Sequence, residues 1–156
     1  MKKGEKIQAF VESLGGGSAH DPCYEGYFVC FNDQKYYEAH DVLEHLWLKE
    51  QGPSHRFFKG LIQLAGAFVH LQKQYRRPEH PTDGRRLRPA WRLFKLAYAN
   101  LEPYLPRFLD LDVGLVLELC LKNVVEIEGA EFKTNPWSPV AAPTLALGVP
   151  GTSGDK

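Results

Sequence analysis

The sequence contains few cysteines. It has three in 156 residues, Cys23, Cys30 and Cys120, and no two of them form a CxxC pair. This excludes a disulfide-dense secreted scaffold and a cysteine-based zinc ribbon. An odd number of thiols also leaves one unpaired in any disulfide scheme. We therefore expect free core cysteines and a cytoplasmic location, where thiols stay reduced.

The sequence also lacks net charge and long hydrophobic runs. It carries 19 basic and 19 acidic residues, so it has no overall field that would attract nucleic acid or an anionic membrane. No stretch approaches the roughly 18 to 20 consecutive apolar residues that a membrane helix requires. The first residues lack the apolar core of a signal peptide. We expect no membrane association.

Helical periodicity is the main positive feature of the sequence. Apolar residues recur at spacings of three and four, and no segment alternates convincingly with the period of two that marks a strand. Asp21, Ser54 and Asp112 stand at positions suited to N-caps. The predicted helices cover approximately residues 5–14, 22–33, 34–50, 55–75, 88–101 and 113–128. We predict an all-α fold, a compact bundle of five to six helices.

The helical part of the chain, residues 1–133, is long enough to form one domain around one hydrophobic core. Residues 134–156 are rich in proline, glycine and serine and show no periodicity. Such a composition predicts a mostly disordered tail, from which Trp137 can fold back onto the bundle.

Two polar residues lie on the apolar side of the predicted third helix. His40 and Glu44 are one turn apart and share a helical face with Leu43 and Trp47. Burying an imidazole and a carboxylate is costly unless they find partners, so this pair marks a candidate site. The other polar residues of this helix are expected on the opposite, solvated side: Glu38, Asp41, His45 and Lys49.

The predicted fourth helix carries a matching polar strip. It is apolar on nearly every side, which indicates a central helix, but Lys59, Gln63, Gly66 and His70 share one narrow face. If this strip faces the third helix, His40, Glu44, Gln63 and His70 converge in a polar pocket inside the bundle, near Trp47.

Two hypotheses fit such a pocket. In the first, the polar groups satisfy one another and only fix the packing of the helices. In the second, they bind a small polar ligand or a divalent metal, for which His40, Glu44 and His70 supply three nitrogen and oxygen ligands. The spacing does not match the HExxH motif of metalloproteases. If the site is catalytic, Glu44 is the candidate base for hydrolase-type chemistry.

A stripe of basic residues is the second candidate feature. Arg85, Arg88 and Arg92, followed by Lys95, lie along one outer face of the predicted fifth helix. Such a stripe can bind phosphate groups, although the neutral chain and the lack of interleaved exposed aromatic residues argue against nucleic acid. The alternative function is an interaction module for a protein, RNA or phosphate partner. The many aromatic residues within 24–37 are also compatible with homo-oligomerisation.

Two stretches together resemble a known family. FNDQKYYEAHDVLEHLW, from Phe31, and FFKGLIQLAGAFVHLQKQ, from Phe57, resemble the signature of the domain of unknown function 309 family, which are small all-helical prokaryotic proteins. The resemblance covers residues 24–128 and implies a helical bundle, without an activity. Through its Glu-Ala-His-Asp motif it adds Glu38 to the candidate pocket, and it places a glycine where this chain has Gln34.

Overall fold

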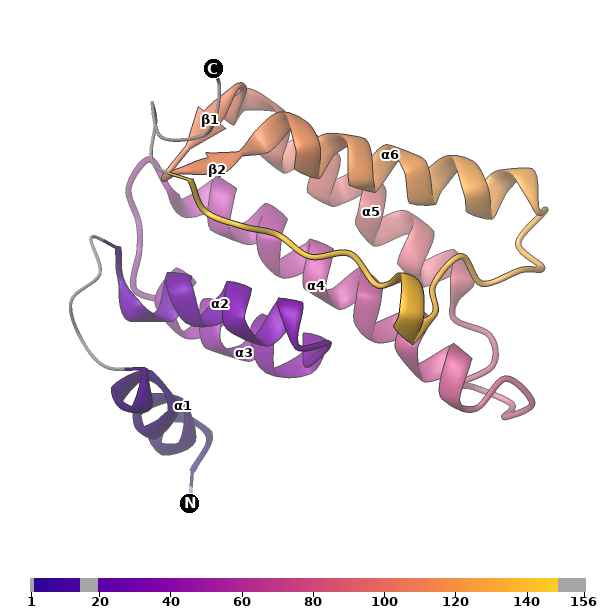
Figure 1. Cartoon of the computed structure of the whole chain (residues 1–156), viewed down its shortest axis with the longest axis horizontal. Coiled ribbons are helices and arrows are strands. Elements are labelled where there is room, and N and C mark those ends of the chain that lie inside the picture. The colour runs from indigo at the N-terminus through magenta and orange to yellow at the C-terminus, as the bar shows by residue number, and fades with distance from the viewer. Residues whose placement is uncertain (1, 15–19, 149–156) are drawn as a thin grey trace.

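The structure is a computed structural model that describes residues 2–14 and 20–148 of the chain. The described part contains six α-helices: α1 Lys3–Ser13, α2 Pro22–Asn32, α3 Tyr36–Trp47, α4 His55–Arg76, α5 Leu87–Leu101 and α6 Val113–Gly129. Helix α4 is central, with α3 packed on one side and α5 on the other (Figure 1). Helix α2 packs against α3, and α6 against α5. The predicted all-α bundle is confirmed.

Shorter elements connect these helices. The turn between α5 and α6 contains the 3-10 helix η1, Glu102–Tyr104, and two short antiparallel strands, β1 at Arg107–Phe108 and β2 at Leu111–Asp112. A further 3-10 helix, η2, covers Pro139–Ala141. Strands of two residues are too short to show the alternation by which a strand is predicted from sequence.

The helix ends agree with two of the three predicted N-caps. Asp21 accepts a hydrogen bond from the backbone N–H of Cys23 at 2.8 Å, and Asp112 accepts one from that of Leu115 at 3.2 Å. The predicted cap at Ser54 is wrong, because its backbone is already helical and its side chain makes no capping bond.

Aromatic side chains of α2 and α3 fill the core. Tyr27 is fully buried and its hydroxyl donates a hydrogen bond of 2.6 Å to the backbone carbonyl of Leu61 in α4. The other buried aromatic residues of this region pack around it: Tyr24, Phe28, Phe31 and Tyr36. These rings are buried, whereas Tyr37 is 60% exposed, and the expectation of oligomerisation from residues 24–37 stays a prediction.

Two backbone positions let the helices come together. A Cβ at Gly60 of α4 would lie 2.7 Å from Cγ of Leu101, so the glycine permits the close approach of α5. Between α2 and α3, Gln34 has a φ of 61°, in the left-handed region where glycine is the least strained residue. This explains why a glycine suits that position.

The chain after Lys133 returns across the bundle. Residues up to Gly148 run over α4, between α6 and α2 (Figure 1). Trp137 is buried and donates a hydrogen bond to the hydroxyl of Tyr36, and Leu145 exchanges two backbone hydrogen bonds with the Asn32 side chain. Trp137 therefore folds back as expected, and residues 134–148 of the predicted tail pack on the bundle, whereas residues 149–156 lie outside the described ranges.

Candidate functional site

Helix α3 brings three potential ligand residues together at the border of its buried face. Tyr36, Ala39, Val42 and Leu43 form that buried face. Beside it, ligand atoms of His40, Asp41 and Glu44 all lie within 4.8 Å of one another. Nδ1 of His40 is 3.2 Å from Oδ1 of Asp41. We call these three residues the α3 cluster.

The α3 cluster is half-buried. The side chains of His40 and Glu44 are each 33% exposed, and that of Asp41 is 18% exposed. The expectation that Asp41 lies on a solvated face is therefore wrong. Helix α1 folds over this side of α3 and covers it, which the periodicity of α3 alone does not reveal.

Lys3 of α1 supplies a positive charge to the cluster. Its Nζ lies 3.2 Å from Oδ1 of Asp41 and 3.5 Å from Oε1 of Glu44. The hydrogen bond to Asp41 is the main cause that raises the pKa of Lys3 above its ordinary value, so the ammonium form is favoured here. The cluster thus already attracts one cation.

The other edge of the His40 ring approaches α4. A Cβ built on Gly66 would lie 4.0 Å from Cδ2 of His40 and 3.2 Å from Cδ1 of Leu93 in α5. Gly66 therefore makes room chiefly for Leu93, while the imidazole lies at ordinary contact distance from the central helix. His40 is held between Asp41 on one side and α4 on the other.

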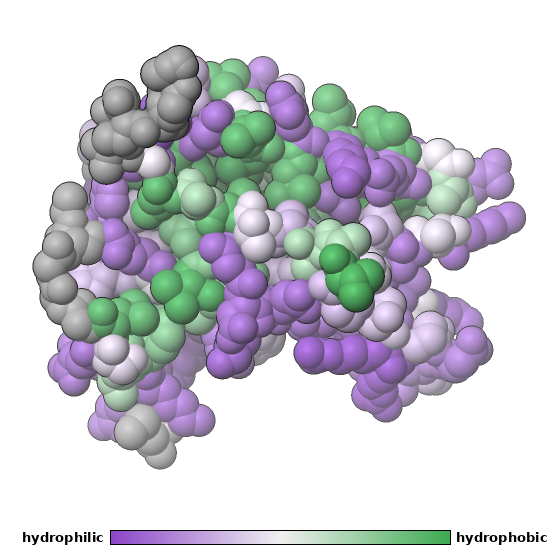
Figure 2. Space-filling view, in the orientation of Figure 1, coloured by the Kyte–Doolittle hydropathy of each residue, from purple (hydrophilic) through white to green (hydrophobic). Residues whose placement is uncertain are grey.

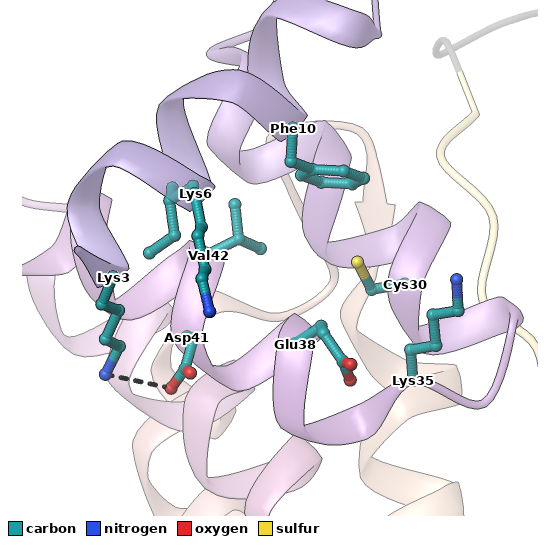
Figure 3. Close-up of a pocket in the computed structure, with 9 residues that line it drawn as sticks. Lys3, Lys6, Phe10, Cys30, Lys35, Glu38, Asp41 and Val42 are labelled. Carbon is teal, nitrogen blue, oxygen red and sulfur yellow. Dashed lines mark ion pairs between the residues drawn. The ribbon is translucent and has the colours of Figure 1, made fainter. Parts of the chain in front are cut away.

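A pocket of about 260 Å³ opens on the α1 side of α3. Figure 3 shows Glu38 and Asp41 on the side of α3 that faces α1, with the Lys6 side chain extending from α1 towards them. The walls combine three lysines, two acids and an apolar floor: Lys3, Lys6, Lys35, Glu38, Asp41, Ile7, Phe10, Cys30 and Val42. Asp41 also lines a second hollow of about 140 Å³, together with Glu44 and His45.

Gln63 and His70 do not join the cluster. Gln63 accepts a hydrogen bond of 2.7 Å from Asn100 of α5, and Nδ1 of His70 lies 3.2 Å from a guanidinium nitrogen of Arg86. Burial, and secondarily the charge of Arg86, lowers the pKa of His70 to about 4. The polar strip of α4 therefore faces α5 and the loop before it. In the candidate ligand set, Asp41 takes the place that we assigned to His70.

Trp47 and Glu38 occupy separate surroundings. Trp47 stacks on His55 with ring centroids 4.8 Å apart, and its buried Nε1 has no hydrogen-bond partner among the residues that the structure describes. Trp47 therefore serves the packing of the connection between α3 and α4. Glu38 is exposed at the pocket wall, where its charge adds to the burial that raises the pKa of the Cys30 thiol to about 11.

Comparison with known families supports the resemblance that the sequence suggested over part of residues 24–128. Residues 24–78 match the model of the family described as Domain of unknown function (DUF309). The match covers 55 of the 156 residues, so the likeness to the DUF309 family is limited to this segment. The segment contains the α3 cluster and Glu38, whereas Lys3 and Lys6 precede it and α5 and α6 follow it. No curated protein and no solved structure matches the chain.

The basic stripe beyond the DUF309 segment is partly engaged with aromatic rings. The guanidinium carbon of Arg88 lies 4.2 Å from the centroid of the Phe132 ring, and Nζ of Lys95 lies 4.2 Å from that of Trp91. Arg85 and Arg92 are exposed. The anion-binding role of Arg85, Arg88 and Arg92 stays a prediction. None of the helices in residues 2–14 and 20–148 has the length and apolar character needed to span a bilayer.

Lys3, Lys6 and Asp41 are the site residues that the sequence analysis missed. A signal for the two lysines was present, because Lys3, Lys6, Ile7 and Phe10 follow one another at helical spacing. A lysine on the same stripe as apolar residues can lay its apolar stem along the surface against which the helix packs, with its charge at the edge of the contact.

Proposed function

We propose that this protein binds a divalent metal ion through His40, Asp41 and Glu44. The observation that carries the proposal is the convergence of one imidazole and two carboxylates with their ligand atoms within 4.8 Å of one another. A nitrogen ligand combined with two oxygen ligands suits zinc, manganese or iron, whereas calcium and magnesium prefer oxygen alone.

The electrostatics of the cluster support a cation. Two carboxylates at a half-buried position repel each other unless a positive charge lies between or beside them. Lys3 fills that role from α1, at 3.2 Å from Asp41 and 3.5 Å from Glu44. A doubly charged ion would satisfy the same carboxylates more strongly and would displace the lysine ammonium.

The neighbouring pocket indicates what a bound metal would face. Three protein ligands leave coordination positions open for water or for a small molecule. Asp41 lines the 260 Å³ pocket beside Val42 and Phe10, so a ligand with an oxygen donor and a short apolar part would fit beside the ion. We therefore propose a small polar ligand as the second component of the site.

A reducing compartment agrees with this proposal. Cys23, Cys30 and Cys120 are all free and buried. Burial raises the pKa of their thiols to about 11, 11 and 12, so they are neutral and poor nucleophiles at neutral pH. We propose a cytoplasmic location and no role for these thiols in the site.

Isothermal titration of the metal-free full chain with Zn²⁺ and Mn²⁺ tests the proposal. One ion should bind per chain, and His40→Ala or Asp41→Asn should weaken binding by at least about tenfold. Glu38→Gln is the matched control, because this carboxylate lies on the same helix outside the α3 cluster, and its loss should leave the metal affinity unchanged.

Measurement of the free energy of unfolding with and without the ion separates the proposal from a purely structural network. A metal present at about 100 times its dissociation constant should stabilise the wild type by about 2.7 kcal/mol. His40→Ala, with an affinity at least about tenfold weaker, should lose at least about half of that gain at the same metal concentration. If the metal stabilises neither protein and the variant is simply less stable, the cluster is structural.

A further inference from the structure

Helix α6 has an exposed face that contains large apolar side chains. Its inner side is buried against the bundle, but Leu115, Leu121 and Val125 are 59%, 51% and 58% exposed. Figure 1 shows α6 at the edge of the bundle, with α5 on its inner side. In Figure 2, hydrophobic surface interrupted by hydrophilic surface follows that edge. Large apolar side chains on the outer side of a helix, when they form a patch, are typical of an interaction surface.

Two shallow hollows accompany this face. One of about 240 Å³ lies between α5 and α6 and is lined by Lys95, Tyr98, Cys120, Leu121 and Val124. The other, of about 360 Å³, extends along α6. Leu121 lines both of them, so a partner that covers α6 would find recesses beside its apolar residues.

Four residues form a stripe along the exposed face of α6. Leu115, Glu118, Lys122 and Val125 follow one another at spacings of three, four and three residues, which places them on one side of a helix. All four are exposed. The stripe is therefore apolar at both ends, with one acidic and one basic residue in the middle.

This stripe is complementary to itself in the antiparallel direction. Leu115 and Val125 are equally far from Cys120 on opposite sides, and so are Glu118 and Lys122. When two copies of α6 lie antiparallel about a twofold axis near Cys120, Leu115 faces the partner's Val125 and Glu118 faces the partner's Lys122. The symmetry repeats each contact, which gives two apolar contacts and two ion pairs.

We propose that the chain forms a homodimer through the exposed face of α6, with the two helices antiparallel. Charge complementarity favours a second copy of this chain as the occupant. In the reversed order the basic residue stands opposite the acidic one, and apolar residues stand opposite each other. An interface of one 17-residue helix from each chain is at the small end of specific interfaces. The dimer is therefore expected to dissociate at concentrations on the order of 10 µM.

Sedimentation equilibrium of the full chain between low and high micromolar concentration tests the dimer. The wild type should show a monomer–dimer equilibrium. Glu118→Lys and Lys122→Glu should each weaken it by at least about tenfold, because each places like charges opposite each other twice. Lys133→Glu, an exposed charge reversal outside α6, is the control and should dimerise like the wild type.

A mixture of the two charge variants tests the antiparallel pairing of Glu118 with Lys122 most directly. A Glu118→Lys chain presents two lysines and a Lys122→Glu chain presents two glutamates, so the mixture should form heterodimers with the affinity of the wild type. A wild type that stays monomeric at all concentrations would overturn the proposal. A dimer that is insensitive to both substitutions, or a mixture that fails to associate, would also overturn the proposal. Circular dichroism of each variant is the control for correct folding.

Discussion

Nζ of Lys3 in α1 lies 3.2 Å from Oδ1 of Asp41 in α3, and this ion pair joins the first helix to the candidate metal site. The pair unites two parts of the chain that the DUF309 match separates, because Lys3 precedes the matched segment and Asp41 lies within it. Any cation that binds the α3 cluster must compete with Lys3. The occupancy of the site and the position of α1 are therefore coupled.

Lys3→Ala should tighten metal binding. Removal of an ammonium group next to the ion abolishes both the competition for Asp41 and the repulsion of the incoming charge, so we expect about a tenfold higher affinity. Titration calorimetry with Zn²⁺ measures the change. Lys6→Ala, which removes a charge from the same helix at the pocket wall, is the control and should have a smaller effect. Equal effects of the two substitutions would show that Lys3 does not occupy the metal position.

Acid should destabilise the protein through His70. The folded chain holds the pKa of His70 at about 4, below its ordinary value of 6.5, so the unfolded chain binds the proton first as the pH falls. The stability present above pH 6.5 is therefore lost as the pH falls from 6.5 towards 4. The loss is about 2 kcal/mol, less than the full linkage value because solvent screens the half-buried ring.

Urea unfolding of the wild type and His70→Gln at several pH values measures this effect. The difference in unfolding free energy between the two proteins should change across the interval from pH 6.5 to 4, with the wild type losing more. A constant difference across the interval would mean that His70 is not kept neutral in the fold.

Asn32→Ala should release the returning segment at residues 134–148. The Asn32 amide donates to the carbonyl of Leu145 and its oxygen accepts from the backbone N–H of Leu145, each at 2.7 Å. Their loss should cost about 1 to 2 kcal/mol of unfolding free energy. It should also speed the proteolytic removal of the segment. Asp33→Ala, at the adjacent exposed position, should change neither quantity. An unchanged Asn32→Ala protein would show that the other contacts of the segment, such as those of Asn135 and Trp137, are sufficient to anchor it.

The sequence predicted the helices well because their signals are local. The caps at Asp21 and Asp112 and the apolar stripe of α5 all depend on residues within a few positions of one another. The fold-back of Trp137 was expected, but the contacts of the rest of residues 134–148 were not, because they join residues that are distant in the sequence. Trp137 and Leu145 meet residues more than a hundred positions away, and composition carries no information about such contacts.

The candidate site was predicted in part for the same reason. Helical periodicity identified His40 and Glu44 as neighbours, and the structure places them in one cluster. Helical periodicity also placed Gln63 and His70 on one strip of α4. Periodicity does not tell which neighbouring helix such a strip faces, and in the structure both residues bond to groups outside α3. Asp41 was assigned to the solvated side because the periodicity of α3 does not show that Lys3 of α1 packs against it.

Anomalous diffraction from crystals of the full chain grown with Mn²⁺ or Zn²⁺ tests the central claim most directly. We predict one strong anomalous peak within bonding distance of His40, Asp41 and Glu44, with Nζ of Lys3 displaced from Asp41. A peak at another place, or no peak while the Lys3–Asp41 ion pair remains intact, would contradict the account.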